Sequence, residues 1–303
     1  FAGSGESAPL LPLRRWTGEP VSGRRILVIG EQGIGDEILF ASFLPVLATR
    51  GASIVLACAP RLVPLFRRAW PGFEIHGHDC RSGTPLPFLC TQVDLQVPIG
   101  SLPGLLSKDT AHSFPGAPFL RADADGTRRW RTRHGALGPG IKVGLSWRGG
   151  TARTIARRSL PAVALARLGS VPGVRFVDVQ YGSTASERSE LARIGIQLAH
   201  FDDTDPLRDI DEFASQLAAL DLLISVDNSS VHLAGALGVP TWVLQHKVPE
   251  WRWGTGRTDC RWYASVRQFR QTERGNWADV IREVADALAT VTPAGGAYRL
   301  GSG

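Results

Sequence analysis

The sequence contains no methionine, and only three of its 34 basic side chains are lysines: Lys108, Lys142 and Lys247. Arginine therefore carries nearly all of the positive charge, and its planar guanidinium group matches the oxygens of phosphate. The arginines are scattered along the chain and are not interleaved with aromatic residues in a basic stripe. A net charge of +6 in this form does not indicate a nucleic-acid-binding protein, and we expect no nucleic-acid partner.

The sequence also lacks the uninterrupted run of about 18 apolar residues that a membrane-spanning helix requires. Its first residues do not have the order of positive charge followed by an apolar stretch that marks a signal peptide. Its four cysteines include no C-x-x-C pair. Together these absences favour a cytoplasmic protein with reduced thiols.

One cluster of metal-binding residue types occurs in the first half of the chain, at His76, His78, Cys80 and Cys90. These residues could surround zinc, but their spacing matches no structural zinc pattern. We therefore expect no bound metal and no other cofactor.

A length of 303 residues and a hydrophobic content of 43% suit two α/β domains of roughly 150 residues each. Short apolar runs alternate with helical segments, which predicts parallel, doubly wound sheets. A stretch rich in proline and glycine at residues 107–140 indicates the domain boundary. We predict a leader or linker, a first domain, a second domain and a closing amphipathic helix with its tail, at residues 1–23, 24–138, 139–275 and 276–303.

The strands that the apolar runs predict are short and buried. In the first domain they lie at residues 25–30, 53–58, 73–76 and 93–98, and in the second at 142–147, 174–180, 196–201, 222–226 and 241–244. The predicted helices of the second domain lie at residues 161–168, 186–194, 211–220, 232–237 and 276–291.

Residues 222–244 form the clearest structural unit of the chain. An apolar strand is followed at once by the helix-capping residues Asp227 to Ser230, and a small-residue helix then ends at Gly238, where a left-handed residue belongs. The loop lies at the carboxyl end of a strand, where open α/β sheets bind ligands. The start of such a helix attracts anions, phosphate in particular, although an ordinary strand–helix turn with a good cap explains the same residues.

A second candidate loop follows the first predicted strand. Gly33 and Gly35 predict a tight turn, and Asp36 stands at the start of the next helix. The spacing does not fit G-x-G-x-x-G, because Ile38 occupies the third glycine position, and no P-loop pattern occurs. Standard dinucleotide and P-loop sites are therefore excluded, and Asp36 is either an acid on one wall of an interdomain cleft or a carboxylate that stabilises the helix start.

Polar residues gather after three predicted strands of the second domain, and the carboxyl ends of parallel strands meet at one edge of a sheet. Arg158 belongs to a loop at the same edge, and an arginine beside a helix start can clamp a diphosphate. His232 either lines the site or is structural. The candidate ligand-binding residues are Gly33, Gly35, Ser146, Trp147, Arg148, Arg158, Gln180, Tyr181, Asp227, Asn228, Ser229, Ser230 and His232.

Several ordered segments resemble the heptosyltransferase-like glycosyltransferases of family nine. These segments are GEQGIGDEILFASFLP, VDLQVPIGSLP, VGLSWRGG with RRSLP, VDVQYG, ISVDNSSVHLAGALGVPTWVL and PEWRWG, all within residues 24–290. The chain looks most like the catalytic region of bacterial proteins that join tetratricopeptide repeats to such a domain. The resemblance implies a GT-B fold, in which two Rossmann-like domains face a cleft, with the donor in the C-terminal domain and the acceptor in the N-terminal one.

The resemblance also implies inverting sugar transfer without a metal. It assigns the general base to Asp36 and donor phosphate contacts to residues 227–237, and Arg158 matches a basic phosphate-binding side chain. The implied partners are a nucleotide-sugar donor and a protein or glycan acceptor. A tetratricopeptide-repeat region outside this chain and peripheral membrane association are further expectations. Asn228 stands where the family more often has threonine.

Two other functions fit the same residues. A non-catalytic nucleotide-sugar or protein-binding module would need the phosphate-binding loop but no base, and an epimerase-like GT-B enzyme would share both domains. The presence of Asp36 together with the phosphate-binding motif favours catalysis. The sequence therefore predicts an inverting, metal-independent glycosyltransferase.

Overall fold

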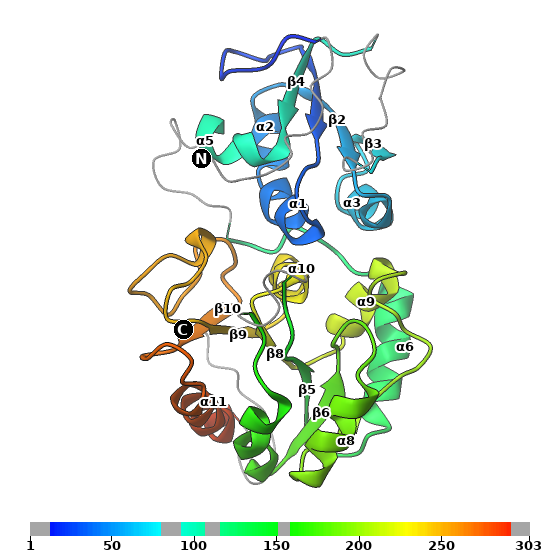
Figure 1. Ribbon diagram of the computed structural model, residues 1–303. Coiled ribbons are helices and arrows are strands. Elements are labelled where there is room, and N and C mark those ends of the chain that lie inside the picture. The colour runs from blue at the N-terminus through cyan, green and yellow to red at the C-terminus, as the bar shows by residue number, and fades with distance from the viewer. Residues whose placement is uncertain (1–12, 80–91, 107–115, 151–157, 292–303) are drawn as a thin grey trace. The chain divides into compact units, whose positions relative to one another are not determined.

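The computed structural model of the protein describes residues 13–79, 92–106, 116–150 and 158–291 (Figure 1). The chain divides into two compact units, Phe1–Arg121 and Ala122–Gly303. Each unit contains one parallel sheet with helices between successive strands, which confirms the predicted α/β class.

The first unit has a four-stranded sheet with the order β3-β2-β1-β4. Its strands are β1 (Arg25–Ile29), β2 (Ser53–Cys58), β3 (Glu74–Gly77) and β4 (Leu95–Pro98). Its helices are α1 (Ile34–Ala41), α2 (Leu44–Thr49), α3 (Val63–Ala69) and α5 (Leu102–Leu106), with the 3₁₀ turns η1 (Pro60–Leu62) and η2 (Ile99–Ser101). Pro45 lies in the first turn of α2 and separates it from α1, as a proline inside a helical pattern is expected to do.

Residues 13–23 belong to the first unit and are not the leader that the sequence predicted. Trp16 is 1% exposed, and its backbone N–H donates to the carbonyl of Gln96 in β4 at 2.9 Å. The N–H of Gln96 in turn donates to the carbonyl of Arg14 at 3.0 Å. The large apolar surface of Trp16 and these edge-strand bonds order a segment whose proline and glycine content suggested a linker. Residues 1–12 lie outside the described part of the chain.

The second unit has a six-stranded sheet with the order β10-β9-β8-β5-β6-β7. Its strands are β5 (Ile141–Ser146), β6 (Val174–Asp178), β7 (Leu198–Ala199), β8 (Leu222–Val226), β9 (Thr241–Gln245) and β10 (Val266–Arg270). Its helices are α6 (Ala124–Gly135), α8 (Ala185–Arg193), α9 (Ile210–Leu217), α10 (Ser229–Leu237) and α11 (Ala278–Val291), with the 3₁₀ helices η3 (Ala162–Ser170) and η4 (Trp251–Trp253).

The second unit differs from the prediction in several elements. Helix α6 falls in the stretch predicted as the boundary, and it packs on α9, where Trp130 donates its indole N–H to Glu212 at 2.8 Å. The division between the units therefore lies ahead of α6 rather than at residues 138–139. The predicted α-helix at residues 161–168 is the 3₁₀ helix η3, and strand β10 was not predicted.

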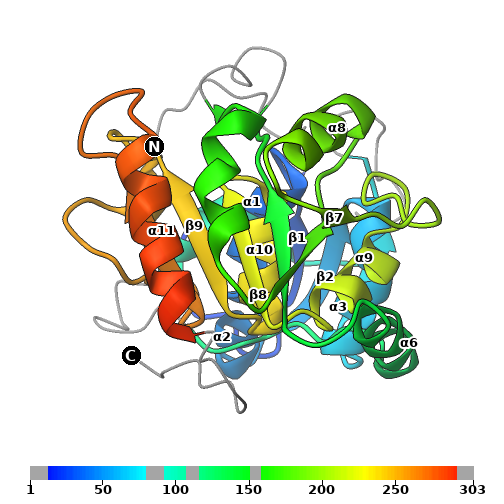
Figure 2. The same cartoon turned by 90° about the horizontal axis from the view of Figure 1, so that it is seen from below.

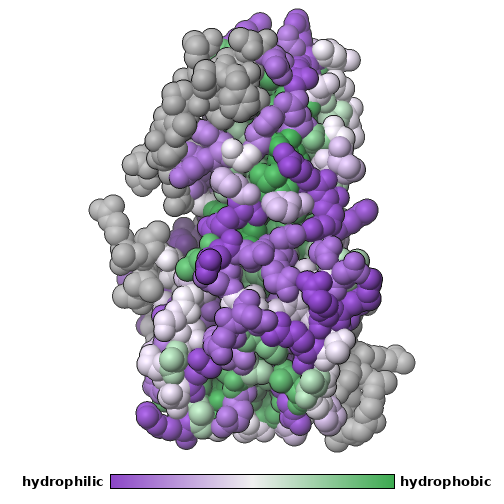
Figure 3. Space-filling model, turned by 90° about the vertical axis from the view of Figure 1, so that its right-hand side faces the viewer, coloured by the Kyte–Doolittle hydropathy of each residue, from purple (hydrophilic) through white to green (hydrophobic). Residues whose placement is uncertain are grey.

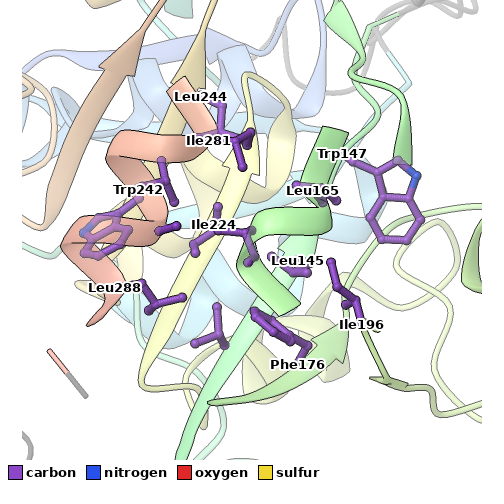
Figure 4. Packing of buried hydrophobic residues seen from close by; sticks show 14 of the residues in the cluster. Leu145, Trp147, Leu165, Phe176, Ile196, Ile224, Trp242, Leu244, Ile281 and Leu288 are labelled. Atoms are coloured by element: carbon purple, nitrogen blue, oxygen red, sulfur yellow. The ribbon is translucent and has the colours of Figure 1, made fainter. Parts of the chain in front are cut away.

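An apolar cluster lies on one face of the second sheet (Figure 4). It joins Leu145 of β5 and Ile224 of β8 to Leu165 of η3 and Ile281 of α11, all of which are at most 2% exposed. Figure 2 shows α11 beside η3, with which it is in contact. Helix α11 is therefore part of the second unit's core, whereas the sequence separated it as a closing segment from residue 276. Burial of each such side chain contributes roughly 1.5–3 kcal/mol.

A few large apolar side chains are exposed among the described residues. Figure 3 shows a face on which hydrophilic side chains surround smaller apolar areas. Val248 and Trp251, in the segment after β9, are 70% and 50% exposed. Across the four described ranges, no helix has both the length and the apolar character needed to cross a bilayer.

Candidate functional site

Each sheet has a point at which its winding reverses. In the second unit the chain runs from β5 outward to β7 and returns to β8, which pairs directly with β5. In α/β proteins, ligands bind beside such a point, at the carboxyl ends of the strands. The polar residues that the sequence singled out follow β5, β6 and β8 at this edge.

The side chain of Gln180, after β6, organises the loop that follows β5. Its Oε1 accepts hydrogen bonds from the Ser146 hydroxyl at 3.0 Å, the Trp147 N–H at 2.9 Å and the Arg148 N–H at 2.8 Å. Gln180 and Ser146 are 5% and 3% exposed, so water competes little for these bonds. Gln180 therefore shapes the loop, and its carbonyl oxygen is occupied by the protein itself.

Asn228 uses both ends of its amide. Its Oδ1 accepts from the Ser230 N–H at 3.0 Å and so caps α10, as the sequence predicted. Its Nδ2 donates to the Ser146 hydroxyl at 2.8 Å and to the Arg148 carbonyl at 3.0 Å. Asn228 thus joins the loop after β8 to the loop after β5. The helix ends as predicted, with Gly238 in the left-handed conformation at φ 77°.

Glycine lets the β5 loop approach the start of α10. A Cβ atom at Gly149 would lie 2.8 Å from the carbonyl oxygen of Asp227 and 3.3 Å from that of Arg158. Such a distance to backbone is too short for any side chain, so this loop, Arg158 and the helix start are packed together.

Two arginines and two carboxylates lie at the same edge. Arg158 forms an ion pair with Glu250, and the two side chains are 21% and 31% exposed. Arg252 Nη1 lies 4.0 Å from Asp227 Oδ2, with side chains that are 11% and 5% exposed. Burial raises the pKa of Asp227, and the charges of Arg252 and Arg158 oppose this rise. The edge therefore holds two guanidinium groups, a chemistry suited to phosphate oxygens, and that of Arg158 belongs to the more exposed pair.

His232 is a buried member of α10. It is 3% exposed, its Nδ1 lies 3.1 Å from the Tyr263 hydroxyl, and its ring stacks on Trp253 at 5.4 Å between centroids. Burial lowers the pKa of His232 well below its ordinary value, and the charges of Arg252 and Arg158 lower it further. His232 is therefore neutral and supports the helix from within.

Three further candidate residues differ in burial and in their contacts with the protein: Arg148, Tyr181 and Trp147. Arg148 Nη2 donates to the Ser183 carbonyl at 2.8 Å, and its Nη1 lies 3.1 Å from Glu187 Oε1. The Trp147 side chain is 1% exposed within the apolar cluster of Figure 4. Tyr181 is half-buried, and burial raises the pKa of its hydroxyl. The arginine is thus engaged with the neighbouring loop, and the tryptophan serves the core.

In the first unit the winding reverses between β1 and β4, and Asp36 lies half-buried in the first turn of α1, directly after β1. The left-handed residue of this loop is Gln32, with φ 67°. Gly33 is extended at φ −109°, and Gly35 lies inside α1, so the prediction of a turn made by these glycines is wrong. A left-handed glutamine is uncommon, and such strain gathers at functional loops.

The two glutamates that flank Asp36 anchor this loop on both sides. Glu37 Oε2 accepts from the Ala59 N–H at 2.9 Å, and Glu31 Oε1 accepts from the Gly100 N–H at 3.1 Å. A Cβ at Gly100 would lie 2.5 Å from Glu31 Oε1, so glycine permits this approach. Burial raises the pKa of Glu31, and the negative charge of Asp36 adds to the rise.

The sequence patterns did not place Glu250 and Arg252 at the site. Both lie in the PEWRWG segment after β9, and Glu250 is 92 positions away from Arg158. The signal that could have found them is their position after a strand next to β8 in the sheet. Across the described ranges, no three His, Cys, Asp or Glu side chains are arranged to hold a metal ion. Cys80 and Cys90 lie outside those ranges.

Comparison with known sequences gives one informative relative, and no protein-family model matches the chain. Protein FlbA of Caulobacter vibrioides is 34% identical over 292 residues, which cover 92% of this chain and 48% of FlbA. The chain therefore spans less than half the length of this relative.

Solved glycosyltransferase structures share the architecture of both units. The family 9 glycosyl transferase of Veillonella parvula has a TM-score of 0.59 at 13% identity and covers 91% of this chain and 96% of its own. The E. coli ADP-heptose LPS heptosyltransferase II has a TM-score of 0.62 at 15% identity, covering 88% and 98%. The chain has the GT-B fold. E. coli heptosyltransferase WaaC, solved with ADP, agrees with this at a TM-score of 0.55 and 13% identity, covering 88% and 100%.

Proposed function

We propose that the chain is the catalytic part of a glycosyltransferase. It would move a sugar from a nucleotide-activated donor to a hydroxyl group of a protein or glycan acceptor, with inversion at the anomeric carbon and without a metal ion. The observation that carries this proposal is the pair of guanidinium groups, Arg158 and Arg252, beside the capped start of α10 in a GT-B fold. Solved structures with this fold include heptosyltransferases, one of them bound to ADP.

The donor diphosphate would lie at the carboxyl edge of the second sheet. Arg158 supplies charge-assisted hydrogen bonds to phosphate oxygens. The start of α10, where Ser229 lies half-exposed, supplies the positive end of the helix dipole. Ser146, Gln180 and Asn228 act indirectly, because their polar groups bind one another and hold the loops in place. Tyr181 is the half-buried aromatic residue at the same edge.

Asp36 would be the general base. In a single inverting step, the acceptor oxygen bonds to the anomeric carbon as the bond from that carbon to the phosphate oxygen breaks. The proton of the acceptor hydroxyl passes to the Asp36 carboxylate, and the electron pair of the broken bond leaves with the nucleoside diphosphate. Arg158 would stabilise the negative charge that develops on that leaving group.

We propose further that a tetratricopeptide-repeat region outside this chain selects the acceptor, and that the protein is cytoplasmic with peripheral attachment to a membrane. This chain corresponds to 48% of the relative FlbA.

Release of nucleoside diphosphate from a panel of ADP-, UDP-, GDP- and dTDP-sugars tests the function. We expect one nucleotide class to be turned over, and turnover to be lost in Asp36→Asn while donor binding persists. A protein that binds a donor tightly but releases no diphosphate with any acceptor would instead be a binding module.

A further inference from the structure

We propose that Glu250 competes with the donor diphosphate for Arg158, so that donor binding exchanges one ion pair for another. The inference rests on the proposed function, because that function assigns Arg158 to the donor phosphates. It adds a residue that limits donor affinity and keeps the phosphate-binding arginine neutralised until the donor arrives.

The contact joins two loops that are distant in sequence. Arg158 lies in the segment after β5, and its Nη2 group pairs with Oε1 of Glu250, which directly precedes η4. A carboxylate binds a guanidinium group through the same N–H groups that a phosphate uses. Glu250 therefore occupies, on Arg158, the kind of position that a donor phosphate oxygen would take.

Burial determines which of the two ion pairs can be exchanged. The Arg252–Asp227 pair is 11% and 5% exposed, and breaking it would leave charges deep in the protein. The Arg158–Glu250 pair is 21% and 31% exposed, so a released Glu250 carboxylate can regain water. The Arg158–Glu250 pair is therefore the one that the donor diphosphate breaks.

The charge of the cluster points in the same direction. Arg158 and Arg252 face two carboxyl groups, those of Glu250 and Asp227, whereas an excess of positive charge favours the binding of a diphosphate. Burial is the main cause of the raised pKa of Asp227, which precedes the cap of α10, and the negative charge of Glu250 adds to the rise. Glu250 therefore opposes an incoming anion in two ways: it occupies Arg158 and it repels the ligand.

Glu250→Gln is the variant that tests the exchange, because it keeps the shape and the hydrogen-bonding oxygen but removes the charge. Isothermal titration calorimetry of the full chain would use three probes: ADP, inorganic pyrophosphate and adenosine. We expect ADP and pyrophosphate to bind about tenfold more tightly to the variant than to the wild type. Adenosine, which has no phosphate, should bind equally to both.

Two controls separate exchange from a general change of charge. Glu283→Gln alters the net charge equally, but Glu283 lies in α11 in an exposed pair with Arg267, so it should leave all three affinities unchanged. In an Arg158→Ala background, Glu250→Gln should give a smaller gain than it gives in the wild type, because only the repulsion remains. Melting temperatures of all variants verify that they are folded.

The possible results separate a failure of the proposed ion-pair exchange from a failure of the proposed function. If wild type binds ADP and Glu250→Gln binds it equally or more weakly, Glu250 positions Arg158 and the exchange is wrong, while the proposed function stands. If neither form binds ADP or pyrophosphate, the titration is repeated with UDP, GDP and dTDP, and failure of all of them overturns both proposals. An equal gain in Glu283→Gln would reduce the effect to net charge and would also overturn the exchange.

Discussion

The loop after β1 and the loop after β8 both lead into a helix beside the point where a parallel sheet reverses its winding. In the first unit, Glu31 binds the loop after β4, and the neighbouring acid Asp36 stays half-buried in the first turn of α1. In the second unit, Asn228 binds the loop after β5, and charged residues of both signs surround the start of α10. The same topology thus carries an acidic loop in one unit and a charge cluster of both signs in the other.

The difference concerns what each loop can do for a ligand. The first loop is held by bonds from Gly100 and Ala59 to the two glutamates that flank Asp36, and it contains a left-handed glutamine. This arrangement suits an acid that must keep one orientation while it takes up a proton. Beside the second loop lie Arg158 and Arg252 of neighbouring loops, each paired with a carboxylate, which suits reversible capture of an anion.

Asp36→Asn tests the role of the first loop most sharply, and we expect it to have the largest effect on turnover. The amide keeps the size of the side chain but cannot accept a proton, so turnover should fall by roughly 10²–10⁴ while donor affinity stays unchanged. Steady-state rates and donor titration measure the two quantities. Asp125→Asn, in the exposed first turn of α6, is the matched control and should leave both unchanged. Near-normal turnover in Asp36→Asn would reduce Asp36 to a helix-stabilising residue.

Arg158→Ala tests the role of the charge cluster at the start of α10 in donor binding. It removes a charge-assisted contact to the donor phosphates, and donor affinity should fall about 10- to 150-fold in calorimetry. Arg257→Ala, which removes an arginine paired with Asp259 near the surface, should leave the affinity unchanged. An equal loss in both variants, or none in either, would take Arg158 out of the donor site.

Asn228→Ala tests whether the second loop depends on one bridging side chain. The variant loses the cap of α10 and the bonds to Ser146 and Arg148, which should lower the free energy of unfolding by about 2–3 kcal/mol in urea titration. Asn228→Thr can still cap the helix but cannot reach across, so it should lose less. If threonine costs as much as alanine, the cap contributes nothing and the bridge alone matters.

The pH dependence of stability probes the anchoring of the first loop. Burial raises the folded-state pKa of Glu31 above its ordinary 4.5, so the folded protein holds this proton to higher pH than the unfolded chain does. The contribution of Glu31 to stability is therefore present at low pH and declines as the pH rises from 4.5 through the folded-state pKa. Glu31→Gln should flatten that decline in urea titrations between pH 4 and pH 7, and an unchanged pH profile would contradict the assignment.

A chelator should have the smallest effect of all. Arginine side chains rather than a metal ion balance the donor phosphates in the proposed mechanism, so turnover should persist in excess EDTA. A loss of activity that Mg²⁺ or Mn²⁺ restores would contradict metal independence.

The sequence was most informative where local signals agreed. Capping residues, a small-residue helix and Gly238 predicted the unit at residues 222–244, and the structure confirms its strands, its cap and its left-handed C-terminal residue. Helix α6 was missed because its residues are mostly polar and its flanks are rich in glycine and proline. Strand β10 was missed because only Val266 and Phe269 of its five residues are apolar, so it shows neither an apolar run nor strict alternation.

The candidate site was predictable in its location but not in its contacts. Residues after β5, β6 and β8 were expected to meet, and they do. Their polar groups bind each other, however, and a pattern read along one chain cannot reveal which partner a buried amide will find. The pairing of Arg158 with Glu250, across 92 positions, has no local signature at all.

Nuclear magnetic resonance of the isotope-labelled chain tests the central claim most directly. Titration with ADP, UDP, GDP and dTDP should move the side-chain resonance of Arg158 and the amide resonance of Ser229 for at least one of the four, with saturation at one ligand per chain. Resonances of the Arg257–Asp259 pair should stay in place. No shift with any nucleoside diphosphate, or shifts that avoid the carboxyl edge of the second sheet, would contradict the account.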